Sequence, residues 1–344
     1  MTGMGLPPPP GLPPPPGHPQ AGGMPPGGPP PAPAPVAIRA LNLGEVLDGA
    51  FKLFVASWRT IVVVVGIFLV PLQLLSAYLQ RDLLGGGLLE MMTDPTSAEL
   101  FMQPGGAGED LAFLLTVLQG VLVQPLITGT VAAVAAASYL GGAIQPGEAL
   151  SAGLRRWWAL IASWLLLIIA ATLPLAVAGA VIALAAVGGL PVPAVVLAGI
   201  LLVLAGVAAS LAIASLFAAA PAAIVIERLG PLRGLRRSAR LLRPRLLPVI
   251  GTLVVAMLLV SVLSVALGGI PQFVGMMVGG LGWVLVAVGA ILAGLVTTPL
   301  LAIVVTLLYF DGRVRHEALD LRLAADAMSG DHTRWDTPGG LPGR

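Results

Sequence analysis

The chain has no cysteine and few charged residues, and each shortage excludes a class of protein. Its 344 residues include only 3 His, and Asp, Glu, Lys and Arg together make up 10% of the sequence. Without cysteine there can be no disulfide framework, no thiolate metal site and no cysteine nucleophile. Because a soluble domain carries about a quarter charged residues, this chain is not an ordinary water-exposed globule.

Long apolar stretches make up most of the chain, which is 57% hydrophobic. A helix needs about 20 apolar residues to cross a hydrocarbon core about 30 Å thick. The glycines and prolines of residues 188–193 interrupt the uncharged run from Trp157 to Ile226, which is therefore predicted to form two spans. We predict an all-α, polytopic membrane protein with six transmembrane helices. The predicted spans are residues 61–78, 111–139, 159–187, 192–226, 247–267 and 283–309.

The basic residues are divided unevenly among the polar segments. Of the 18 Lys and Arg residues, 17 lie before the first predicted span or after the second, fourth and sixth. The remaining one, Arg81, lies in a loop with six acidic residues. Because Lys and Arg accumulate in cytoplasmic loops, we predict a multi-pass protein of the cytoplasmic membrane with both termini in the cytoplasm.

The two ends of the chain differ in composition from its centre. Residues 1–35 contain 16 Pro, 8 Gly and no charged residue, a composition that cannot form a hydrophobic core. We predict a disordered cytoplasmic tail over residues 1–38, a six-span membrane domain over 39–325 and a second disordered cytoplasmic tail over 326–344. The proline-rich tail is either a spacer, which its composition favours, or a strip for a proline-binding partner.

Three of the basic segments also have the pattern of an interfacial amphipathic helix. Asn42 and Glu45 have the spacing of a capping box, and apolar residues follow at three- and four-residue steps as far as Trp58. Similar patterns cover residues 148–158 and 232–246. An interfacial helix, an outward span and a return span would then occur three times, which suggests three two-span repeats.

Three segments resemble a known family of membrane proteins. They read LGEVLDGAFKLF (43–54), LRRSARLL (235–242) and LYFDGRVRHEALDL (308–321). These residues resemble the actinobacterial multi-pass proteins related to the glycerophosphoryl diester phosphodiesterase membrane domain, over roughly residues 39–325. The resemblance implies a helical membrane domain of unknown activity, which in some relatives precedes a soluble phosphodiesterase domain. Here the non-membrane pieces, of about 42, 30 and 34 residues, are too short to bury an enzyme core.

Residues that could support catalysis or hold a metal are scarce. His316, Glu317 and Asp320 lie at helical spacing, but this pattern is also typical of a solvated amphipathic helix, which is the interpretation we favour. We therefore predict no enzyme activity, no catalytic residue, no metal site and no cofactor.

Prolines lie within five of the predicted spans, and two of these prolines follow a polar residue. Gln124-Pro125 and Thr298-Pro299 each place a hydrogen-bonding side chain beside a backbone carbonyl that has lost its helical partner. Transporters bind substrates at such breaks, but kinked helices also pack together without a ligand, and both interpretations stay open. The other three prolines are Pro71, Pro174 and Pro221.

The segment between the fourth and fifth spans is rich in arginine. Contact with anionic lipid headgroups would contribute about 1 kcal/mol for each residue at the membrane surface, whereas the alternative is that these arginines only fix topology. No folded nucleic-acid-binding module accompanies the charge, so we do not expect a nucleic acid partner. The candidate lipid-contacting residues are Arg233, Arg236, Arg237, Arg240 and Arg243.

The sequence therefore leaves two functions open. The first is a non-enzymatic scaffold or lipid-associated assembly module, with anionic bilayer lipids as its partner and a membrane protein or a second copy of the chain as further candidates. The alternative is a transporter or permease for an uncharged or lipid-like solute, which would use the proline breaks and the Gln, Thr and Ser side chains of the spans.

Overall fold

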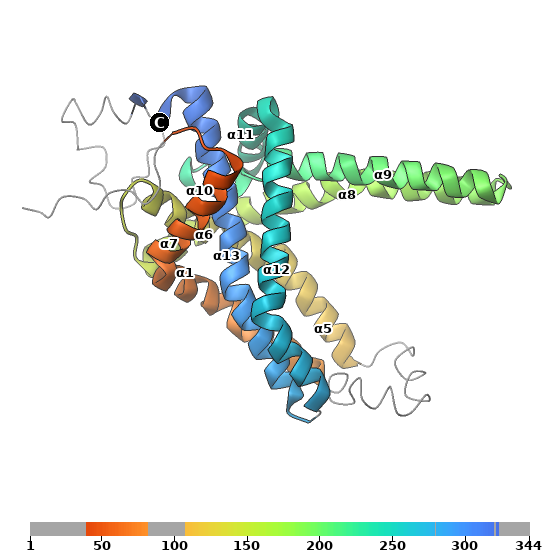
Figure 1. The fold of residues 1–344 in the computed structure, drawn as a ribbon, viewed down its shortest axis with the longest axis horizontal. Coiled ribbons are helices and arrows are strands. Elements are labelled where there is room, and N and C mark those ends of the chain that lie inside the picture. The colour runs from red at the N-terminus through yellow and green to blue at the C-terminus, as the bar shows by residue number, and fades with distance from the viewer. Residues whose placement is uncertain (1–38, 82–106, 279, 320, 323–344) are drawn as a thin grey trace, which may run out of the picture. The chain divides into compact units, whose positions relative to one another are not determined.

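The computed structural model describes residues 39–81, 107–278, 280–319 and 321–322 (Figure 1). The predicted tails, residues 1–38 and 326–344, lie outside the described residues. The helices are α1 (Leu43–Leu79), α5 (Ala107–Leu118), α6 (Gln124–Tyr139), α7 (Pro146–Leu154), α8 (Trp157–Val187), α9 (Val192–Phe217), α10 (Ala220–Ile226), α11 (Pro231–Leu242), α12 (Leu246–Val278) and α13 (Gly282–Glu317), with a π-helical turn η1 (Gln119–Val123) and a 3-10 turn η2 (Arg243–Arg245).

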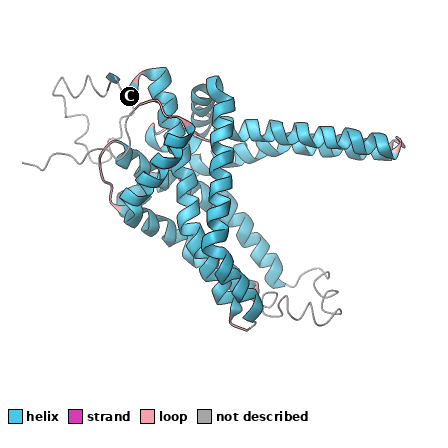
Figure 2. Cartoon of the chain, in the orientation of Figure 1, coloured by secondary structure: helices cyan, strands magenta, loops and turns pink. Residues whose placement is uncertain are grey.

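The described part of the chain is helical and contains no strand (Figure 2). Within it, six helical segments are long and apolar enough to cross a membrane, which confirms the predicted all-α fold with six candidate spans. Several helices extend beyond the predicted spans. Helix α12 continues to Val278 and α13 to Glu317.

Helix α1 begins at the capping box predicted from the sequence. The Glu45 backbone N–H donates to Asn42 Oδ1 at 3.0 Å, and the Asn42 backbone N–H donates to Glu45 Oε2 at 2.9 Å. The helix then passes through a non-helical residue, Ser57 (φ −119°, ψ 17°), and continues to Leu79. The structure thus joins the predicted first interfacial helix and first span into one kinked helix, whereas α7 and α11 are separate helices that precede α8 and α12.

The five prolines predicted to interrupt spans fall into three groups. Pro221 lies in the first turn of α10, after a short turn, whereas Pro125 directly follows the π-helical turn within the continuous helical stretch Asp110–Tyr139. A proline is tolerated in the first turn of α10 because its missing N–H would have no helical partner, and at Pro125 the altered hydrogen bonding of the π-helical turn accommodates the ring. Pro71, Pro174 and Pro299 lie inside continuous helices.

Helix α13 is the centre of the packing. It contacts α1, α6, α10, α11 and α12, and every residue from Ala302 to Val314 is buried. The rings of Phe310 and Tyr139 stack with their centroids 4.6 Å apart, which fixes the end of α6 against α13. Two glycine pairs bring α12 and α13 together: a Cβ on Gly282 would lie 1.9 Å from the Gly275 oxygen, and one on Gly289 would lie 2.6 Å from the Gly268 oxygen.

Helices α8 and α9 pack along each other and expose apolar side chains over most of their length (Figure 1). Gly206 allows the close approach, since a Cβ there would lie 3.3 Å from the Pro174 carbonyl oxygen. Near the connection between the two helices, Val187 is 88% exposed and Val192 is 74% exposed. Such a continuous apolar surface suits contact with lipid rather than with water.

The structure brings the basic segments together at one end of the helices. The Leu41 backbone N–H donates to Asp311 Oδ1 at 2.8 Å, and Arg315 Nη2 donates to the Leu41 carbonyl at 2.8 Å. Helix α7 packs on α1 and α6, and α11 packs on α10 and α13 near the same buried core. This arrangement agrees with a common side for these segments. Their cytoplasmic location stays a prediction.

Candidate functional site

The α11–η2 segment carries the five predicted lipid-contacting arginines and divides them into two groups. Arg237 turns toward the protein: its Nε donates to Glu227 Oε1 at 2.7 Å, and its Nη1 forms an ion pair with Glu317. The other four are exposed and form no ion pair with any residue that the structure describes. They are Arg233, Arg236, Arg240 and Arg243.

Close packing determines which face of α11 is buried. A Cβ on Gly234 would lie 2.4 Å from Ile224 Cγ1, so no larger residue fits between α11 and α10 without movement. Ser238 Oγ donates to the Leu216 carbonyl at 2.8 Å, which attaches the same face to the end of α9. Since residues at three- and four-residue steps share a helix face, Arg237 lies beside these buried positions.

The carboxylates that hold Arg237 also join α10 to α13. Glu227 Oε1 accepts a hydrogen bond from the Tyr309 hydroxyl at 2.5 Å, and Glu317 Oε2 accepts one from Arg313 Nε at 3.2 Å. The side chains of Arg237, Glu227 and Glu317 are 17%, 16% and 22% exposed. Charge-assisted hydrogen bonds are stronger than neutral ones, so this cluster is suited to fixing three helices together.

Asp311 organises a second ionic cluster at the same end of the helices. It accepts hydrogen bonds from Arg315 Nε at 2.8 Å and from the Leu41 backbone, and Arg245 approaches it at 3.6 Å. These contacts connect the segment before α1 and the turn η2 to α13. Like the Arg237 cluster, they satisfy charges within the protein.

The partial metal site considered in the sequence is not assembled by the described residues. His316 is exposed, and Glu317 is engaged with Arg237 and Arg313. Asp320 lies outside the described residues. In the part of the chain that the structure describes, no three His, Asp or Glu side chains gather as metal ligands would.

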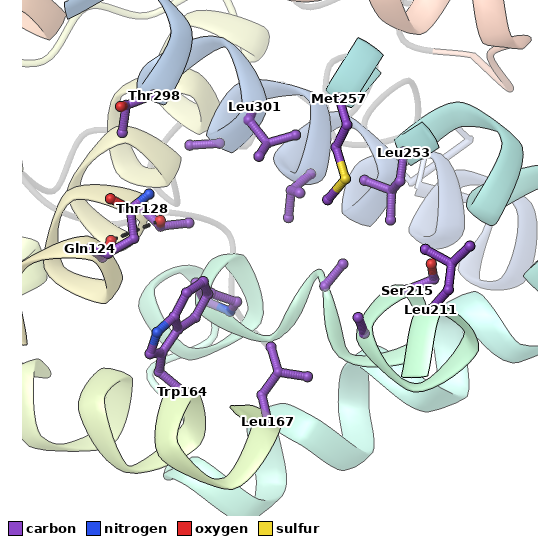
Figure 3. Close-up of a pocket in the computed structure, with 15 residues that line it drawn as sticks. Gln124, Thr128, Trp164, Leu167, Leu211, Ser215, Leu253, Met257, Thr298 and Leu301 are labelled. Atoms are coloured by element: carbon purple, nitrogen blue, oxygen red, sulfur yellow. Dashed lines mark hydrogen bonds between the residues drawn. The ribbon is translucent and has the colours of Figure 1, made fainter. Parts of the chain in front are cut away.

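A cavity of about 160 Å³ lies among α6, α8, α9, α10, α12 and α13 (Figure 3). Gln124 and Thr298, which the sequence identified separately as polar residues at proline breaks, both line this cavity. The prolines that follow them in the chain, Pro125 and Pro299, are buried. Pro221, at the start of α10, is itself a lining residue. Residues at or next to prolines of three helices, Gln124, Pro221 and Thr298, therefore line one space.

Ser215 on α9 also lines the cavity, and it is one of the Gln, Thr and Ser side chains of the spans that the sequence offered as a possible lining. Trp164 on α8 lines it as well and could not be identified from the sequence (Figure 3). The Arg237 cluster was not predicted from the sequence either. One available signal was that Glu227 is the only acidic residue between Glu148 and Asp311, so a buried arginine near it has few other partners.

Comparisons with known proteins add no identification. The chain matches no protein-family model, no curated protein and no solved structure.

Proposed function

We propose that this protein is a non-enzymatic integral membrane module that associates with anionic lipid headgroups through α11. The observation that carries the proposal is the division of the arginines, in which Arg237 is neutralised by Glu227 and Glu317 while four others remain exposed. If these arginines only fixed the topology, it would not matter which of them point into the protein and which point outward. The module would lie in the cytoplasmic membrane with both termini in the cytoplasm.

The four exposed arginines form a stripe suited to phosphate groups. Positions 233, 236, 240 and 243 follow one another at three- and four-residue steps, so they project from the same side of the segment. Exposed apolar residues accompany them, with Leu232 58% and Leu247 80% exposed. Guanidinium groups bind phosphate oxygens in a bidentate manner, and the leucines would rest among the upper parts of the lipid chains.

The wider assignment rests on sequence patterns. The three segments that resemble the glycerophosphoryl diester phosphodiesterase membrane domain support a helical membrane module, and the scarcity of residues that could support catalysis favours a role without chemistry of its own. A scaffold of this kind would act by holding lipids, another membrane protein or a second copy of the chain.

Lipid preference of the purified protein tests the role of α11. We expect the detergent-solubilised chain to retain phosphatidylglycerol in preference to phosphatidylcholine, measured by native mass spectrometry. Replacing Arg233, Arg236, Arg240 and Arg243 by Gln should weaken phosphatidylglycerol binding by more than tenfold, because each contact contributes about 1 kcal/mol. Added salt should weaken the wild-type preference in the same direction.

Arg237 provides the matched control on the same helix. The variant Arg237→Gln loses one positive charge, as each of the four substitutions does. It should keep the preference for phosphatidylglycerol, since the guanidinium of Arg237 is already engaged by Glu227 and Glu317. An undiminished preference in the fourfold variant would show that the arginines only fix topology and would refute the proposal.

Transport of an uncharged or lipid-like solute is a second candidate function. The observation that favours it is that the polar residues Gln124 and Thr298 line one cavity among the apolar helices. Broken helices beside a cavity are a feature of transporters. Proteoliposomes should then take up such a solute at a rate that falls when Gln124 is replaced by Leu. An absence of uptake across a broad panel of uncharged solutes would remove this candidate.

A further inference from the structure

The cavity among α6, α8, α9, α10, α12 and α13 has walls without charge. Its lining is formed mainly by Leu, Ala, Val, Met and Trp side chains, with polar groups at a few positions. A charged ligand would lose its hydration here without gaining a counter-ion. The chemistry of the walls therefore selects an uncharged and largely apolar ligand.

The volume limits how much of a ligand the cavity can hold. Its size, about 160 Å³, is close to that of an engineered apolar cavity of about 150 Å³ that binds benzene. A ring or a short alkyl segment fits, whereas a complete lipid does not. Any larger ligand must keep most of its length outside.

Polar groups in the lining have hydrogen-bonding capacity to spare. Ser215 is 1% exposed, and its hydroxyl has no partner within the described part of the chain. The Thr128 hydroxyl is satisfied by the Gln124 carbonyl at 2.9 Å, whereas no described residue bonds the Gln124 side-chain amide. Figure 3 shows Gln124 and Thr298 on one side of the view and Ser215 on the other. Because buried polar groups are nearly always paired, the buried Ser215 hydroxyl indicates a ligand with a hydrogen-bonding function, and the half-buried Gln124 amide is a second group that such a ligand can bond.

The rim of the cavity meets an apolar surface. Met257 on α12 lines the cavity and is 47% exposed, and its neighbour Leu258 is more exposed still. A surface of this kind lies against lipid chains in a membrane. A ligand dissolved in the bilayer could reach the cavity from the side.

We propose that this cavity is a binding site for an uncharged amphiphile of the bilayer, with its apolar end enclosed and its hydroxyl, ester or amide group hydrogen-bonded to Gln124. The site deepens the second candidate function, since it is the same cavity, but it does not require transport and is independent of the anionic headgroup contacts proposed for α11. It has a different chemistry, because it selects against charge, and it lies on different residues.

Quenching of Trp164 fluorescence gives a direct test. The other tryptophans, Trp58, Trp157, Trp158, Trp283 and Trp335, are replaced by Phe, and the full chain is reconstituted in phosphatidylcholine vesicles. The probe is 6-bromo-1-hexanol, whose bromine quenches indole on contact. Quenching should saturate with concentration, and the hydroxyl-free 1-bromohexane should bind more weakly. Gln124→Leu should weaken the alcohol about fivefold to tenfold, as for the loss of one hydrogen bond, and leave the bromoalkane unchanged.

A filled cavity and a matched surface change complete the experiment. Ala214→Phe introduces a ring at a lining position of α9 and should abolish saturable quenching. Ala208→Phe introduces the same ring at an exposed position of the same helix and should leave it intact. Quenching that rises in proportion to probe concentration, with no effect of Ala214→Phe, would mean simple partition into the bilayer and would overturn the proposal. The phosphatidylglycerol preference would be unaffected by either result.

Discussion

Arg237 differs from the other arginines of the α11–η2 segment in the surroundings of its guanidinium group. Replacing it with Gln leaves Glu227 and Glu317 without a full counter-charge in a partly buried site. Removing one member of a buried pair costs about 3–5 kcal/mol, and because these side chains keep some exposure we expect a loss of about 2 kcal/mol. Thermal unfolding of the detergent-solubilised protein measures the loss. The adjacent exposed position gives the control: Arg236→Gln should change the unfolding temperature little, and an equal change in both variants would contradict the cluster's stabilising role.

The orientation of single side chains could not be predicted from the sequence. Five arginines at helical spacing predicted a basic face, but the pattern did not show that Arg237 is turned inward, because its partners lie 10 residues before and 80 residues after it in the chain. Gln124 and Thr298 were identified individually by their proline neighbours. Their meeting in one cavity depends on how α6 and α13 pack, and periodicity carries no information about that packing.

Helices α12 and α13 approach so closely that their glycines have structural roles. A Cβ on Gly289 would lie 2.6 Å from the Gly268 oxygen and 2.8 Å from Gln272 Cγ, so Gly289→Ala must push the two helices apart. Overpacking of this kind costs about 1–3 kcal/mol, and we expect a lower unfolding temperature. Gly251→Ala on α12 meets nothing within 4 Å and should be neutral or slightly stabilising, since Ala is the better helix former. Equal effects of the two substitutions would show that the close approach is not needed.

At the scale of the helix, local patterns predicted the structure well where the cause was local. The Asn42–Glu45 capping box is present because both partners lie within one turn. The proline pattern was less informative, since Pro221 begins a new helix, Pro125 follows a π-helical turn and Pro299 lies inside α13. A proline removes the same hydrogen bond in each case, and neighbouring helices determine whether the helix continues. The three two-span repeats stay a prediction.

The orientation of the whole molecule can be tested because the chain has no cysteine. Single cysteines at Gly86, in the predicted outer loop, and at Gly340, in the predicted C-terminal tail, would be the only thiols present. We expect a membrane-impermeant maleimide to label Gly86→Cys in intact cells and to label Gly340→Cys only after the cells are opened. The reason is that 17 of the 18 basic residues lie in segments predicted to remain cytoplasmic.

Leu190→Cys, at an exposed position between α8 and α9, should behave like Gly86→Cys. If the tail were labelled in intact cells and these two positions were not, the topology would be the inverse of the predicted one. The exposed arginines of α11 would then face the outer leaflet, and the proposed association with cytoplasmic anionic headgroups would fail with the orientation on which it depends.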